Sequence, residues 1–76
     1  MAGFNEYTYV TEAQKKIREA QQFIQRPENY DPNSIRNNIN NLKKYLVQGL
    51  RTSYPDTYNE LKQTISKLEK VLERGQ

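Results

Sequence analysis

Apolar residues recur at spacings of three and four along most of this 76-residue chain, which is the spacing of one face of an α-helix. Two proline-containing breaks, at Pro27 and at Tyr54-Pro55-Asp56, divide the pattern into three stretches. The apolar positions are Ala13, Ile17, Ala20 and Ile24; then Ile35, Ile39, Leu42, Leu46 and Leu50; then Tyr58, Leu61, Ile65, Leu68 and Leu72. The pattern predicts three amphipathic helices over about residues 12–26, 32–51 and 55–73.

Residues at the ends of these stretches are typical helix caps. Thr11, followed three residues later by Gln14, fits a capping box at the start of the first helix. Asp31 fits an N-cap, and Pro32 occupies the first helical position, where its missing N–H is not needed. Gly75 is a plausible stop for the third helix.

Short connections between three such helices favour an all-α fold, a small up-down-up bundle over residues 11–76. The first ten residues carry Phe4, Tyr7 and Tyr9 without a helical period. We expect residues 1–10 to form an extended aromatic arm. Only 34% of the residues are apolar and the mean hydropathy is −1.09, so the core is thin. The arm or another protein is expected to cover what is left of the apolar stripes.

The chain contains neither Cys nor His, which excludes a disulfide scaffold, a typical zinc site and histidine catalysis. Glu69 and Glu73 lie one turn apart, but on a polar face where both are expected to be solvated. We therefore expect no enzymatic activity, no cofactor and no metal site. No apolar run is long enough to span a membrane, and no targeting segment is visible at the start.

The net charge of +3 is concentrated in the middle of the chain. Residues 1–31 hold four cations and five carboxylates, and residues 56–76 hold four of each. Residues 32–55 hold four cations and no carboxylate. On one continuous helix, these cations would fall within an arc of roughly 100°. The members of this predicted basic ridge are Arg36, Lys43, Lys44 and Arg51, with Asn40 and Val47 in the same arc.

A basic ridge of this kind favours binding to an acidic protein surface. Tyr7 and Tyr9 are further candidates for partner binding, because tyrosine is enriched at interfaces. Three alternatives stay open. The cations serve solubility alone; or the protein binds nucleic acid, although no helix-turn-helix or RNA-binding signature is present; or the chain self-assembles into a homo-oligomer that completes the thin core.

One part of the sequence resembles the PsbQ family of extrinsic, lumenal subunits of photosystem II. The matching positions are Gln22–Arg26, Tyr30, Ile35–Asn37, Leu42–Lys43 and Leu46, followed by Tyr54–Asp56 and the stripe Leu61, Ile65 and Leu68. In that family a Phe-Ile pair closes one helix, a short loop with an aromatic residue follows, and a Leu-Arg pair opens the next helix.

The resemblance implies a non-enzymatic helical bundle that docks on photosystem II. Such a protein would lie in the thylakoid lumen, peripheral to the membrane, where it would shield the water-oxidising cluster and help retain calcium and chloride. Arg36 and Lys43 match basic positions of the family pattern. Without the resemblance, the sequence indicates only a soluble intracellular protein that does not span a membrane.

Overall fold

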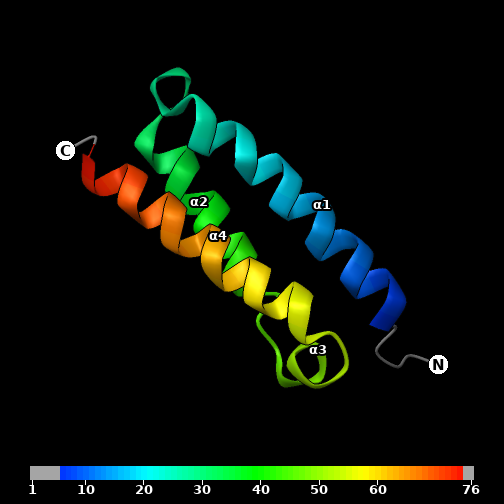
Figure 1. The fold of residues 1–76 in the computed structure, drawn as a ribbon. Coiled ribbons are helices and arrows are strands. Elements are labelled where there is room, and N and C mark those ends of the chain that lie inside the picture. The colour runs from blue at the N-terminus through cyan, green and yellow to red at the C-terminus, as the bar shows by residue number, and fades with distance from the viewer. Residues whose placement is uncertain (1–5, 75–76) are drawn as a thin grey trace.

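The computed structural model describes residues 6–74, and this part of the chain is all-α (Figure 1). The helices are α1 (Glu6–Gln25), α2 (Pro32–Lys43), α3 (Gln48–Ser53) and α4 (Pro55–Arg74), with a short 3₁₀ helix, η1 (Pro27–Asn29), between the first two. The all-α part of the predicted fold class is thus confirmed, but the described residues form four α-helices where three were expected.

The expected N-terminal arm is wrong for residues 6–10, because α1 already begins at Glu6. Val10 explains the difference. It is buried and lies three residues before Ala13, so it extends the apolar stripe by one position toward the N-terminus. Residues 1–5, including Phe4, lie outside the described part of the chain, as does Gly75.

Thr11 is therefore not a helix cap. It lies inside α1, where its Oγ1 donates a hydrogen bond to the Tyr7 carbonyl oxygen at 2.8 Å, one turn earlier. The predicted start of the second helix is confirmed: the Asp31 carboxylate accepts a hydrogen bond from the Asn33 N–H at 3.3 Å, and Pro32 opens α2.

The expected continuous helix over residues 32–51 is also wrong. α2 ends at Lys43, and the chain turns before α3 begins at Gln48. In the turn, the N–H groups of Tyr45 and Leu46 bond back only three residues, to Leu42 and Lys43, and Val47 is extended (φ −111°, ψ 156°). The reason lies in contacts with α1, given below, rather than in a helix-breaking residue.

The core lies where α4 packs against α1, α2 and α3 (Figure 1). In Figure 1, α1 and α4 both run toward the end of the molecule where η1 lies, and α2 runs back from that end. The buried apolar side chains are Val10, Ala13, Ile17, Ala20, Ile35, Ile39, Leu42, Leu50, Leu61, Ile65 and Leu68. Most of the predicted stripe positions are therefore buried, although the molecule is narrow, at 43 × 21 × 15 Å.

Candidate functional site

The residues of the predicted basic ridge do not lie along one helix edge. Arg36, Asn40 and Lys43 lie on α2, where the helical spacing places them on one side. Lys44 falls in the turn, and Val47 is the N-cap of α3. Because the backbone changes direction at this turn, the angular argument that aligned Arg51 with the others does not hold. The four cations stay within the α2–α3 segment and all four are exposed.

The four cations differ in their polar contacts. Lys43 Nζ lies 3.8 Å from Glu69 Oε2 of α4, and both side chains are about half exposed (53% and 51%). An exposed pair of this kind contributes little to stability. Arg36 donates a hydrogen bond to Asn33 Oδ1 at 3.0 Å. Among residues 6–74, neither Arg36, Lys44 nor Arg51 forms an ion pair, so three of the four charges are available to a partner.

The two tyrosines proposed for partner binding have separate roles. Tyr7 is 77% exposed on α1. Tyr9 lies half-buried, and its hydroxyl donates a hydrogen bond to the Lys44 carbonyl oxygen at 2.6 Å. The Tyr9 ring also packs against the Tyr45 ring, with centroids 5.0 Å apart. Tyr9 is therefore a contact between α1 and the turn, and Tyr7 is the tyrosine of the two that can meet a partner.

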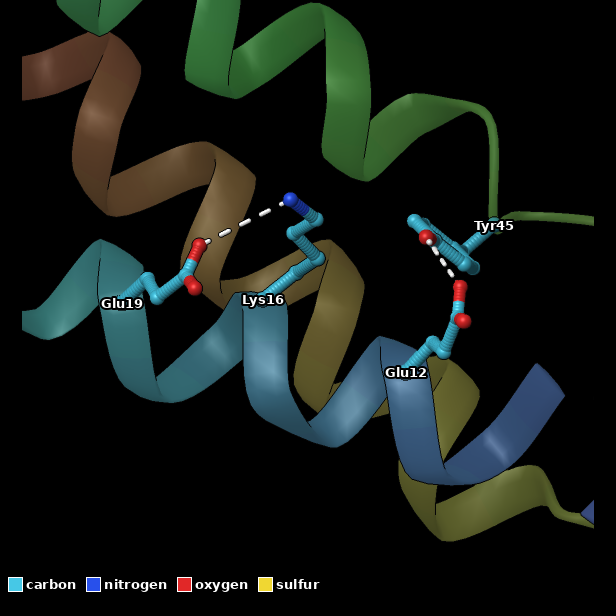
Figure 2. Close-up of polar contacts among 4 residues, drawn as sticks. All are labelled: Glu12, Lys16, Glu19 and Tyr45. Atoms are coloured by element: carbon cyan, nitrogen blue, oxygen red, sulfur yellow. Dashed lines mark hydrogen bonds and ion pairs between the residues drawn. The ribbon is translucent and has the colours of Figure 1, made fainter. Parts of the chain in front are cut away.

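Tyr45 is a second link between the turn and α1. Its hydroxyl donates a hydrogen bond to Glu12 Oε1 at 3.3 Å, and in Figure 2 the ring reaches back from the end of α2 toward that carboxylate. One turn further along α1, Lys16 Nζ pairs with Glu19 Oε1 at 3.7 Å. Glu12, Lys16 and Tyr45 border a depression of about 420 Å³ between α1 and the end of α2, which is lined by Tyr9, Glu12, Lys16, Asn41, Lys44 and Tyr45.

The surroundings of both tyrosines disfavour the ionised hydroxyl. Burial raises the pKa of Tyr45, and the Glu12 carboxylate raises it further through its charge and its hydrogen bond. Burial also raises the pKa of Tyr9. The two hydroxyls therefore stay neutral donors at neutral pH, which maintains their hydrogen bonds to Glu12 and Lys44.

Asn38 lies on α2, three residues after Ile35 and four before Leu42, so it shares the buried face of the helix with them. Its side chain is buried, at 8% exposure, and Oδ1 accepts no hydrogen bond within the described chain. A buried amide oxygen without a donor costs stability. The contacts of Tyr9, Glu12 and Tyr45 form a polar seam between α1 and the end of α2, whereas the side chains that α4 buries are mainly apolar.

A second depression, also of about 420 Å³, lies at the opposite end of α2. Its walls are mainly apolar and come from α1, η1 and the residue after it, α2 and α4: Ile24, Pro27, Tyr30, Pro32, Ile35, Val71 and Leu72, together with the charged residues Glu28 and Arg74. Tyr30 lies in the connection between α1 and α2 and packs edge-on against Phe23 of α1, with ring centroids 4.3 Å apart.

Neither depression was predicted from the sequence. The contacts of Tyr9 and Tyr45 join positions 33 and 35 residues apart, which helical periodicity cannot pair. The only feature of the sequence that pointed to such contacts was the number of tyrosines, six in 76 residues. Within residues 6–74, no group of three or more Asp and Glu side chains is placed to hold a metal ion, and no helix has the length and apolar character needed to cross a membrane.

Comparisons of this chain with protein-family models, curated proteins and solved structures found no match. The resemblance to the PsbQ family therefore rests on the residue pattern alone.

Proposed function

We propose that this protein is a non-enzymatic helical binding module that docks onto an acidic protein surface through its α2–α3 segment. In this proposal, the long helices α1, α2 and α4 form an up-down-up scaffold, and α2, the turn and α3 present the cations. The contact residues are Arg36, Lys44 and Arg51, with Asn40, Lys43 and Val47 beside them.

The observation that carries the proposal is the uneven distribution of charge. Residues 32–55 carry four exposed cations and no carboxylate, whereas the rest of the chain is close to neutral. Three of these cations form no ion pair within the described residues. Such a surface accelerates encounter with an acidic partner and orients the complex.

Photosystem II is the most specific partner that we propose, and the resemblance to the PsbQ family supports it. Arg36 and Lys43 stand at basic positions of that family's pattern. The protein would then be a peripheral subunit on the lumenal side of the thylakoid membrane. Tyr7, exposed on α1, is a further contact residue in this proposal.

Charge reversal tests the docking surface. The variant Arg36→Glu/Lys44→Glu/Arg51→Glu leaves the Lys43–Glu69 pair intact. Wild-type protein should co-sediment with photosystem II membranes whose lumenal side is open, and the fraction bound should fall from about 50 to about 500 mM salt because screening shortens the range of the charges. The variant should bind at least about tenfold more weakly at low salt.

A matched control separates a specific surface from net charge. Lys15→Glu/Arg18→Glu/Lys67→Glu reverses three exposed cations on α1 and α4 and changes the net charge by the same amount. The control should keep most of the binding. Equal loss in both variants, or no loss in either, contradicts docking through α2–α3.

Two further probes separate the partner from the surface. If immobilised poly-glutamate binds the protein but photosystem II membranes do not, the docking surface stands and the PsbQ-like partner is wrong. If double-stranded DNA binds instead, with a log affinity that falls steeply with log salt, the acidic-protein proposal is overturned in favour of nucleic acid.

A further inference from the structure

The turn between α2 and α3 is not specified by its own residues. Residues 44–47 are Lys, Tyr, Leu and Val, with no glycine or proline. Lys44 already has helical dihedral angles (φ −64°, ψ −22°), whereas Val47 is extended. No residue in the described chain has a positive φ. All four residues can therefore enter an α-helix without steric conflict.

The apolar pattern continues through the turn as if it were helical. Leu42, Leu46 and Leu50 are spaced by four and four residues, in line with Ile35 and Ile39 before them. If the turn straightened, a single helix would run over residues 32–53 with all five side chains along one stripe. The same leucines can therefore face the core in the bent form or in a continuous helix.

Contacts with α1 hold the turn in its bent form. The Tyr9 hydroxyl bonds the carbonyl oxygen of Lys44, the Tyr9 and Tyr45 rings pack together, and the Tyr45 hydroxyl bonds Glu12. These contacts are exposed or half-exposed, so each contributes only modestly to stability. Besides these contacts, the bent form is held by the packing of the partly buried Leu46 and Val47 against the core.

We propose that the turn at residues 44–47 is a hinge, and that two copies of this chain exchange their α3–α4 segments when it straightens. The interaction surface is the face of α1 and α2 that α4 covers in one chain, and the partner is α4 of a second copy. Leu61, Ile65 and Leu68 would be buried equally well in either arrangement, because the surface they meet is identical. The two forms therefore differ chiefly at the hinge.

A proline at position 48 distinguishes the two forms. Gln48 is exposed and is the first residue of α3, a position that suits proline, and the extended Val47 before it suits a residue preceding proline. Within a continuous helix, the same proline would remove a hydrogen bond to Lys44 and clash with its carbonyl. Gln48→Pro should keep the circular dichroism of wild type and remain monomeric.

The opposite change should favour exchange. Tyr9→Phe/Tyr45→Phe keeps both rings but removes the two hydroxyl hydrogen bonds that hold the bend. All proteins are refolded from urea at high chain concentration, and their masses are measured by light scattering against the 9.0 kDa of one chain. Where wild type is about one-tenth dimer, the double variant should contain at least about threefold more dimer.

Cross-linking shows whether the dimer is exchanged. Lys43→Cys/Glu69→Cys places thiols where the α2–α4 ion pair stands, in a chain without other cysteines. A short bis-maleimide should link the two within one chain in the monomer fraction and between two chains in the dimer fraction.

The proposal is overturned if wild type stays monomeric under these conditions, if its dimer carries only links within one chain, or if Gln48→Pro forms as much dimer. None of these readouts depends on docking to an acidic partner.

Discussion

The Tyr45 hydroxyl joins the turn after α2 to α1, in addition to the packing of its ring on Tyr9, and burial and the Glu12 carboxylate oppose its ionisation. Its pKa is raised above the ordinary 10.0 of an unfolded chain. The neutral hydroxyl therefore contributes stability that is fully present below about pH 10 and is lost as the pH rises through the folded pKa, since the unfolded state releases this proton first. Tyr9 adds to the loss in the same direction.

We predict that Tyr45 titrates above pH 10. The tyrosinate absorbance of Tyr45→Phe, subtracted from that of wild type over an alkaline titration, isolates this group. Glu12→Gln should lower the pKa of Tyr45, because it removes the neighbouring negative charge that opposes ionisation. A difference titration centred at or below 10.0 in wild type would contradict the contact between Tyr45 and Glu12.

Some residues of the structure were predictable from the sequence and others were not. The apolar stripes correctly placed Leu42, Leu61 and Leu68 in the core, because burial of a helix face follows from spacing alone. The polar seam was missed, since the partners of Tyr9 and Tyr45 lie more than thirty residues away. Asn38 was missed for a different reason: its spacing from Ile35 and Leu42 places it on the buried face, but only apolar residues were counted in the stripe.

At the level of helices, α1 provides a test that separates the sequence interpretation from the structure. If Thr11 were an N-cap, Thr11→Ala would cost about 1 kcal/mol. In the structure Thr11 is exposed inside α1 and its hydroxyl bonds the Tyr7 carbonyl. Alanine has the higher helix propensity, so the substitution should leave the free energy of unfolding unchanged or raise it by about 0.3 kcal/mol.

Asp31→Ala is the matched control for this prediction. Asp31 caps α2 through its carboxylate, and its loss should cost about 1 kcal/mol. Urea unfolding followed by circular dichroism measures both free energies under identical conditions. A loss at Thr11 as large as that at Asp31 would place the start of α1 near residue 11 and not at Glu6.

Helix boundaries were predictable where local chemistry sets them and not elsewhere. Asp31-Pro32 and Pro55 mark the starts of α2 and α4 correctly, because N-caps and prolines act on their immediate neighbours. The break after Lys43 has no such marker and coincides with tertiary contacts to α1, which local sequence cannot predict. The predicted basic ridge assumed one continuous helix, so its four cations are not aligned along a single helix in the structure.

For the whole molecule, α4 is the element that unites the fold. It packs against α1, α2 and α3, whereas the polar seam joins α1 to the end of α2 through the hydrogen bonds of Tyr9 and Tyr45. The stability of this small chain therefore depends on a narrow apolar contact around one helix. Loss of that contact should unfold all four helices together, because the buried residues of α1 and α2 share one core cluster with those of α4.

Leu61→Ala tests this dependence. Leu61 is fully buried on α4, and removing its side chain should cost about 2–5 kcal/mol through lost burial and the cavity left behind. Leu72→Ala, at a half-buried position of the same helix, should cost distinctly less. Since a small domain is stable by only about 5–15 kcal/mol, Leu61→Ala should lower the urea midpoint sharply while unfolding stays a single transition.

Circular dichroism and tyrosine fluorescence should report the same midpoint. If the α1–α2 hairpin kept its helical signal after α4 unfolded, the polar seam would be more stable than its contacts indicate, and α4 would not be the element on which the fold depends.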